Sequence, residues 1–179
     1  MNFSELIKLR QSDRKYDASH KVSRELILQC LEAARLAPSA CNSQPWHFVV
    51  VDGNEQLPAM AEAAAGMGMN KFAAQAPVII AVVLEKMNFT ARIGSVIKDK
   101  EYRLLDVGIA VEHFCLQAAE LGLGTCILGW FNEKQVAKII GVKNHRIPLL
   151  ITLGYSEAHH REKSRKAIEQ IVSWNTYEK

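Results

Sequence analysis

One short segment in the first third of the chain combines stiff, polar and flat groups. It runs from Ala37 to Trp46 and reads Ala-Pro-Ser-Ala-Cys-Asn-Ser-Gln-Pro-Trp. Proline restrains the backbone near either end. The hydroxyl, thiol and amide groups between the prolines can hydrogen-bond a polar ligand, and Trp46 adds a flat apolar surface. The segment therefore predicts either a loop that holds a planar ligand or an ordinary helix-to-strand turn, in which Pro, Ser and Asn are common.

A second candidate lies near the N-terminus, where Arg10-Gln11-Ser12-Asp13-Arg14 places two arginines four residues apart. A helical turn would put both guanidinium groups on one side, with the Ser12 hydroxyl between them. Such a set suits a phosphate, because arginine binds phosphate oxygens through two nitrogens at once. The alternative is a solvated helix end, with Asp13 and Lys15 as local ion partners that contribute little to stability.

The C-terminal part carries another cluster of cations. Its members are Arg161, Lys163, Arg165 and Lys166. Taken alone, this is a solvated run of charge. If the two ends of the chain converge, however, a dianionic phosphate would be neutralised between the two clusters.

Motifs of acid–base, nucleophilic or metal chemistry do not stand out. Gly66-Met67-Gly68 lacks the third glycine of a dinucleotide fingerprint, and Ser39 and Ser43 lack the Gly-x-Ser-x-Gly context of a hydrolase. The four cysteines have no zinc spacing. Three lie in apolar patterns and are expected to be buried, whereas Cys41 is expected to line a ligand. We therefore predict no catalytic side chain and no metal ligand, and expect a cofactor to do the chemistry.

Composition limits what kind of protein this is. With 179 residues, 49% of them hydrophobic and 23% charged, we expect one globular domain over residues 1–179. The net charge of +3 and the lack of interleaved basic and aromatic residues argue against nucleic acid as a partner. The longest apolar run, residues 76–84, is short of the ~20 residues that cross a bilayer. The N-terminus lacks the apolar core of a signal peptide, so we expect a cytoplasmic protein without membrane contact.

Hydrophobic spacing predicts the elements that must position these groups. Helices are expected at residues 3–10, from Ser23 as a cap, at roughly 55–66, at 104–121 and after Asn132. Strands are expected at 47–51, 78–84, 125–128 and 148–153. This alternation predicts an α/β or α+β sheet sandwich whose strand order the pattern leaves open.

The helix at 104–121 has apolar residues around nearly its whole circumference. A surface helix would show a polar face, so we expect this helix to be buried on all sides, within the domain or against a second subunit. Gly122 and Gly124 are expected to end it with a left-handed turn.

Taken together, these segments resemble the FMN-dependent nitroreductase family over nearly the whole chain. The matching motifs, in order, are Arg10-x-Ser12-x-Arg14-x-Tyr16, the run from Glu32 to Trp46, Ala76-Pro77, the Asp106-x-Gly108-Ile109-Ala110 helix with Leu121-Gly122-Leu123-Gly124-Thr125, and Lys163-Ser164-Arg165-Lys166. Two positions depart from the pattern. Cys41 stands where many members have glycine, and Leu128 stands where some have glutamate.

The resemblance implies an α+β fold with a central, mainly antiparallel sheet flanked by helices, in an intertwined homodimer. It implies tightly bound FMN at the subunit interface, with NAD(P)H as co-substrate. The residues it assigns to FMN are Arg10, Ser12, Arg14, Pro38, Ser39, Ala40, Asn42, Gln44, Asn70, Lys71, Leu128, Gly129, Lys163 and Arg165. Of these, Pro38 to Gln44 would reach the flavin of the other subunit, and the backbone at Leu128 and Gly129 would face flavin N5.

The expected function is therefore an FMN-dependent NAD(P)H oxidoreductase that passes hydride through flavin N5 to a small-molecule acceptor. Nitroaromatics, quinones and activated alkenes are the expected acceptors, and residues 87–101 are the region expected to cover the substrate side. Two alternatives stay open. The first is a flavin-binding storage or sensing protein without turnover. The second is a flavin-independent module whose basic ends bind an acidic partner.

Overall fold

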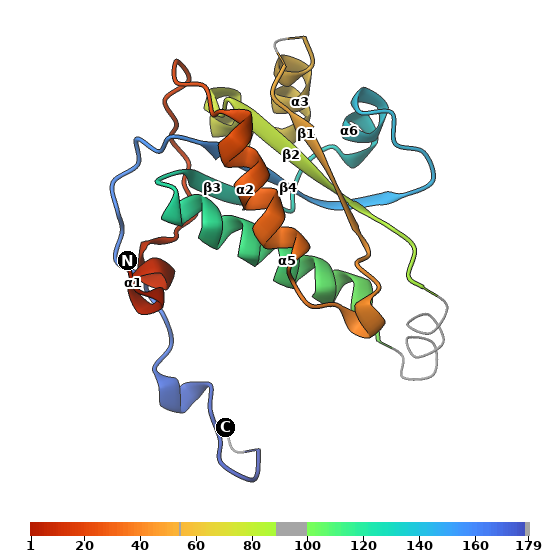
Figure 1. The fold of residues 1–179 in the computed structure, drawn as a ribbon. Helices are drawn as coiled ribbons and strands as arrows, with labels where there is room; N and C mark the ends of the chain where they lie inside the picture. The colour runs from red at the N-terminus through yellow and green to blue at the C-terminus, as the bar shows by residue number, and fades with distance from the viewer. Residues whose placement is uncertain (54, 89–99, 178–179) are drawn as a thin grey trace.

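The computed structural model describes residues 1–53, 55–88 and 100–177, and its centre is one antiparallel sheet (Figure 1). Within this part of the chain, the strands lie in the order β1-β2-β4-β3. Their bounds are Trp46–Val51 for β1, Val78–Leu84 for β2, Gly124–Leu128 for β3 and Arg146–Gly154 for β4. Every neighbouring pair is antiparallel, which confirms the expected α+β class.

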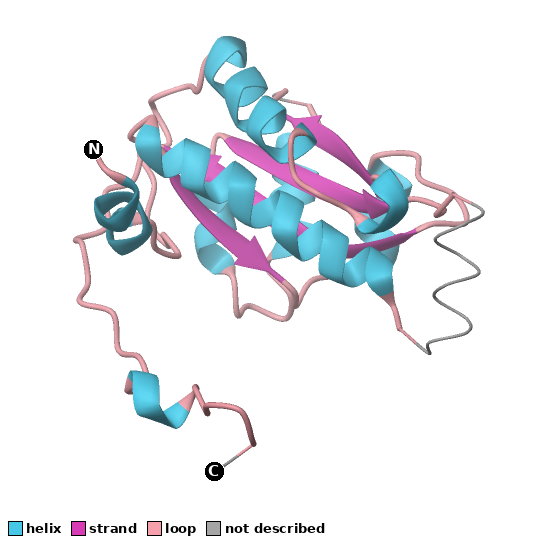
Figure 2. Ribbon diagram, turned by 60° about the horizontal axis from the view of Figure 1, so that its bottom comes forward, coloured by secondary structure: helices cyan, strands magenta, loops and turns pink. Residues whose placement is uncertain are grey.

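Helices cover both faces of the sheet (Figures 1 and 2). The expected helices are confirmed with slightly shifted ends: α1 Phe3–Leu9, α2 Arg24–Arg35, α3 Leu57–Ala64, α5 Tyr102–Glu120 and α6 Glu133–Ile139. Short 3-10 turns are η1 Ala40–Asn42, η2 Lys71–Gln75 and η3 Ile168–Gln170. The Ser23 hydroxyl accepts from the N–H of Leu26, and the Asn132 side chain accepts from that of Gln135, so both predicted caps are present.

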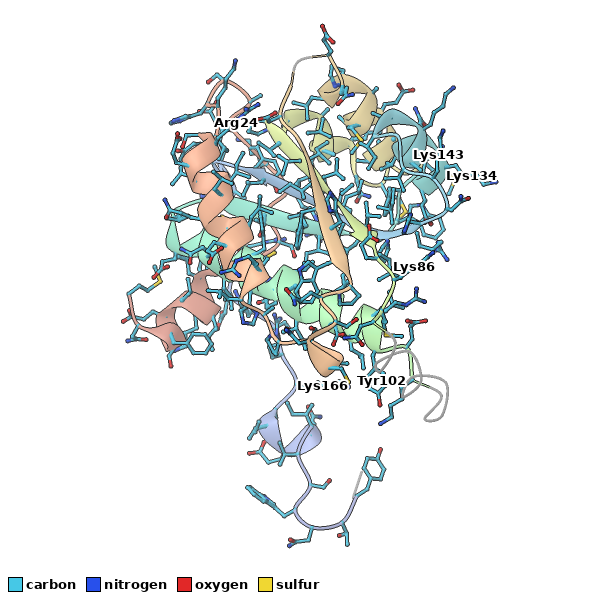
Figure 3. The ribbon with its side chains drawn as sticks, turned by 45° about the vertical axis from the view of Figure 1, so that its right-hand side comes forward. Arg24, Lys86, Tyr102, Lys134, Lys143 and Lys166 are labelled. Carbon is cyan, nitrogen blue, oxygen red and sulfur yellow. The ribbon has the colours of Figure 1, made fainter. Side chains whose placement is uncertain are left out.

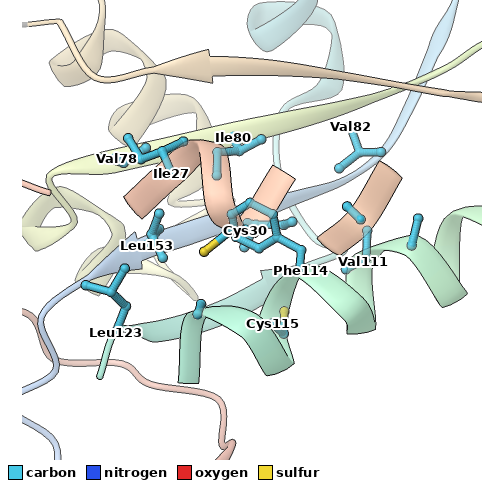
Figure 4. Packing of buried hydrophobic residues seen from close by; sticks show 14 of the residues in the cluster. Ile27, Cys30, Val78, Ile80, Val82, Val111, Phe114, Cys115, Leu123 and Leu153 are labelled. Carbon is cyan, nitrogen blue, oxygen red and sulfur yellow. The ribbon is translucent and has the colours of Figure 1, made fainter. Parts of the chain in front are cut away.

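The alternation of side chains along β2 divides the core into two layers. Val78, Ile80 and Val82 point to one face, where they pack with α2 and α5 around Phe114 (Figure 4). Ile79, Ala81 and Val83 belong to the other face, with Met60 of α3 and Val136 of α6. Because β2 is buried on both faces, it carries no polar residue.

Helix α5 was expected to be buried on all sides, either within the domain or against a second subunit, and the structure of one chain excludes the first alternative. Phe114 and Ala110 are fully buried, but Leu105 is 60% exposed and Leu104 and Ile109 are 48% and 40% exposed. One face of α5 packs on the sheet, whereas the other carries large apolar side chains into solvent. The apolar residues of α5 therefore form two faces, one packed against the sheet and one left exposed by this chain.

Beyond the contacts of Lys163 with Lys8 and Arg10, the C-terminal segment leaves the body of the molecule (Figure 1). It extends away with its apolar side chains exposed, among them Ile168, Ile171, Trp174 and Tyr177. Among the described residues, no helix is both long enough and apolar enough to span a membrane.

Candidate functional site

The arginine-rich N-terminal segment is extended and not helical. Helix α1 ends at Leu9, and the following backbone joins the start of β3, with Ser12 bridged to Thr125 and the N–H of Asp13 donating to the Thr125 carbonyl at 2.8 Å. The expected helical turn is therefore wrong, because this segment is held by pairing with a strand. Alternation along an extended chain still gives Arg10, Ser12 and Arg14 a common side.

The C-terminal segment lies against this same stretch. Nη2 of Arg161 donates to the Ser12 carbonyl at 2.8 Å, and Nζ of Lys163 donates to the carbonyls of Lys8 and Arg10. Residues about 150 positions apart are thus in contact, so the two cationic clusters converge.

Between the two segments lies a pocket of about 310 Å³ whose lining is strongly basic. Five cationic side chains meet one carboxylate, that of Glu162; the cations are Arg10, Arg14, Arg161, Lys163 and Arg165. Ser12 also lines it. Other exposed cations, such as Arg24, Lys134 and Lys143, lie elsewhere on the surface and do not line this pocket (Figure 3). A concentration of positive charge in one hollow indicates an anion site, which we call the anion pocket.

Two groups in the anion pocket show why a phosphate suits it. Nε of Arg10 is buried and has no hydrogen-bond partner in the described part of the chain, although Glu112 Oε1 lies 3.2 Å away. Partial burial lowers the pKa of Lys163, and the guanidinium groups of Arg10 and Arg165 lower it further. Cations crowded together in this way match the negatively charged oxygens of a phosphate.

The loop at 38–44 is held by its own side chains and by α5. The N–H of Ala40 donates to both carboxylate oxygens of Asp106, at 3.2 and 3.1 Å. The Ser39 hydroxyl accepts from the N–H of Gln44 at 2.9 Å, and the Gln44 amide donates to Asn42 Oδ1 at 3.1 Å. The loop's stiffness therefore comes from side-chain hydrogen bonds as well as from proline.

The same loop has unusual backbone angles. Cys41, Asn42 and Gln44 have φ of 50°, 51° and 46°, in the left-handed region that glycine adopts at least cost. This explains why glycine suits position 41 in many nitroreductases. Cys41 is an exposed free thiol, and the other three cysteines are buried, as expected.

A third group of predicted residues lies at the end of β3. The Asn70 amide donates to the carbonyls of Trp130, at 2.7 Å, and Ala64, at 3.2 Å. A Cβ at Gly66 would lie 2.5 Å from the Trp130 carbonyl oxygen, so glycine is needed where this turn meets Trp130. Asn70 is thereby placed beside the chain that follows Leu128 and Gly129. Lys71, in contrast, lines a separate shallow groove along α3.

Strand β3 connects the anion pocket to this third group. Thr125, at its start, is bridged to Ser12, and Gly129 follows its end. The four residue steps from Thr125 to Gly129 span ~13 Å at the rise of a strand. The loop at 38–44 is elsewhere, near the first turns of α5, whereas α1 and the anion pocket lie toward the other end of that helix (Figure 1). A single chain thus unites two of the three groups.

Some residues of these groups escaped prediction. Arg161 was predicted as a member of the C-terminal cationic cluster but was not among the residues assigned to FMN, and Asp106 was noted only as part of a motif. A carboxylate in the early turns of an otherwise apolar helix was the available signal for Asp106. The segment expected to cover the substrate side falls largely at residues 89–99, outside the described residues. In the part that the structure describes, no three His, Cys, Asp or Glu side chains gather as a metal site.

Comparison with known proteins places the chain among nitroreductases. Residues 7–155 match the nitroreductase family. The chain is 27% identical to an oxygen-insensitive NADPH nitroreductase of Helicobacter pylori, over 95% of each chain, and 27% identical to an NADH dehydrogenase of Thermus thermophilus, over 92% of each. It superimposes on the FMN-dependent nitroreductase of Clostridium difficile R20291 with a TM-score of 0.79 at 26% identity, covering 96% of this chain and 98% of the other. This chain belongs to the nitroreductase family.

Proposed function

We propose that this protein is an FMN-dependent NAD(P)H oxidoreductase that reduces electron-poor acceptors such as nitroaromatics, quinones or activated alkenes. The observation that carries the proposal is the anion pocket, where the two ends of the chain bring five cationic side chains together. Relatives named as nitroreductases and as an FMN-dependent enzyme support it.

In this proposal each group of residues has one task. Arg10, Ser12, Arg14, Lys163 and Arg165 bind the phosphate and the adjoining ribityl chain. When bound, FMN supplies a ring that accepts hydride from NAD(P)H and passes it to the acceptor. The backbone at Leu128 and Gly129 orients the ring, and because a main-chain group does this, leucine serves in place of glutamate at position 128. Asn70 is assigned to the edge of the ring, whereas Lys71, which lines the separate groove along α3, has no task in this arrangement.

We further propose that two copies of the chain complete each site. The loop at 38–44 is held at Asp106, while Arg10 of the anion pocket lies at Glu112, farther along the same 19-residue helix. A symmetric pair would bring the loop of the partner subunit over the flavin. Exposed apolar surface on α1, α5 and the C-terminal segment supports this arrangement, because such patches mark contact sites.

The test uses the visible spectrum of the purified protein. We expect bound FMN, and we expect anaerobic NADH or NADPH to bleach it and a nitroaromatic or quinone to restore the colour. Bound flavin that no nicotinamide bleaches would favour storage or sensing and contradict turnover. A colourless protein that takes up no added FMN would overturn the whole proposal.

A further inference from the structure

Asp13 lies between two residues of the anion pocket but faces away from solvent. It is 5% exposed, whereas its neighbour Arg14 is exposed. Its Oδ1 accepts from the Gln11 amide at 2.9 Å and from the Ser156 hydroxyl at 2.7 Å. Both of these partners are neutral. This buried carboxylate lies near five cations, but it accepts its side-chain hydrogen bonds from an amide and a hydroxyl.

Those two partners hold the C-terminal segment. Gln11 accepts from the N–H of Arg161 at 3.1 Å, and its amide also donates to the His159 carbonyl at 3.3 Å. Ser156 accepts from the N–H of Ala158 at 3.1 Å. Asp13 therefore fixes the two side chains that hold residues 158–161, just before Lys163.

The start of β3 is shaped around this carboxylate. A Cβ at Gly124 would lie 2.8 Å from Asp13 Oδ2 and 2.8 Å from the Cβ of Ser156, which is closer than real contacts allow. The φ of Gly124 is outside the left-handed region, so the expected left-handed turn applies to Gly122, with φ of 76°, and not to Gly124. Glycine is needed at position 124 for room. Asp13, Ser156 and β3 thus form one fitted junction.

We infer that Asp13 is a positioning residue of the anion pocket. Through Gln11 and Ser156 it sets where the C-terminal segment lies, and thereby where Arg161 and Lys163 meet the phosphate. This inference rests on the proposed FMN site and goes beyond it, because Asp13 itself does not line the anion pocket. It applies to the phosphate end alone, so the flavin ring should be unaffected.

The sign of the change in FMN binding distinguishes a positioning role for Asp13 from a simple charge effect. A negative charge near a dianion weakens its binding, so if Asp13 acted only as a nearby charge, removing it would tighten the binding of FMN. A positioning role predicts the opposite sign for Asp13→Ala. Asp13→Asn separates the two further, because its amide oxygen accepts the same hydrogen bonds without the charge.

The experiment measures dissociation constants of FMN and of riboflavin, which lacks the phosphate, for the full chain freed of flavin. For Asp13→Ala we expect the FMN dissociation constant to rise about tenfold, which corresponds to ~1.4 kcal/mol, with the riboflavin dissociation constant nearly unchanged. Asp13→Asn should bind FMN at least as tightly as the unchanged protein. Ser156→Ala, at the partner of Asp13 that does not line the anion pocket, should weaken FMN in the same selective way. The exposed Gln29→Ala is a surface control.

The outcomes separate the inference from the function on which it rests. Equal losses of FMN and riboflavin, tighter FMN binding by Asp13→Ala, or an Asp13→Asn variant as weak as Asp13→Ala would each overturn the positioning role. Should Asp13→Ala not fold by circular dichroism, Ser156→Ala decides by the same comparison of the two ligands. If the unchanged protein binds no FMN, the proposed function itself fails.

Discussion

Arg14 illustrates how one exposed side chain can matter for a ligand and not for the fold. It lines the anion pocket and is exposed. We expect Arg14→Ala to raise the FMN dissociation constant about 10- to 100-fold, because a hydrogen bond to a charged group contributes ~1.5–3 kcal/mol. The measurement is the flavin retained on dialysis. Arg24→Ala, which removes an arginine paired with Asp52 at 3.3 Å, should retain flavin fully. Equal retention by the two variants would contradict the phosphate site.

Two buried thiols make stability depend on pH. Burial raises the pKa of Cys30 to about 12 and that of Cys115 to about 11. In the unfolded chain a thiol ionises near pH ~8.5. Above that pH the unfolded chain releases protons that the folded chain keeps, so the free energy of unfolding falls as pH rises toward 11. We expect a lower urea midpoint at pH 10 than at pH 8, and a smaller difference in Cys30→Ala. A midpoint that rises with pH would show that the sign is wrong.

At the scale of elements, the meeting of β3 with the N-terminal and C-terminal segments leaves no room for a methyl group. Gly124→Ala should lower the free energy of unfolding by ~1–3 kcal/mol, the usual cost of overpacking. Gly53→Ala is the control, since a Cβ there meets nothing within 4 Å. Urea titration of both variants is the measurement. Equal free energies of unfolding for the two variants would mean that the residues around Asp13 can shift to accommodate a methyl group, contrary to this prediction.

The layer between the sheet and α5 depends on Phe114. This side chain is fully buried and stacks on Phe48 with ring centroids 6.3 Å apart. Phe114→Ala should lower the free energy of unfolding by ~3–5 kcal/mol, because it removes apolar contact and leaves a cavity. Leu28→Ala, at a position 63% exposed on α2, should change it by less than ~0.5 kcal/mol. A small effect at Phe114 would place the main core elsewhere.

At the scale of the whole molecule, the proposed pairing of subunits and the retention of FMN should fail together. Leu105 is 60% exposed on the uncovered face of α5. Leu105→Glu would place a charge in that contact, so we expect a smaller species by size-exclusion chromatography with light scattering, with loss of visible flavin absorbance. Leu28→Glu, equally exposed on α2, should leave both unchanged. A Leu105→Glu protein that keeps its mass and its flavin would refute the shared site.

Contacts between distant parts of the chain also explain why some predicted elements match the structure and others do not. Strand β2 was predicted with its observed bounds, because residues 78–84 are apolar without interruption and flanked by Pro77. The segment 10–14 was predicted as helical and is extended, because pairing with β3 across more than a hundred residues overrides local spacing. The spacing of residues within a segment predicts its structure when the segment's own residues decide it. The prediction fails when residues far away in the sequence supply the backbone hydrogen bonds.

The sequence by itself determined the α+β class, the capped helices, the buried strands and the family, since these depend on periodicity and on ordered motifs. Only the tertiary structure decided that both ends of the chain build one anion pocket, that α5 keeps an uncovered apolar face, and that Asp13 turns inward between two outward site residues. The reason is physical. Each of these features is a contact between residues far apart in sequence, whose energy arises only when the chain has folded.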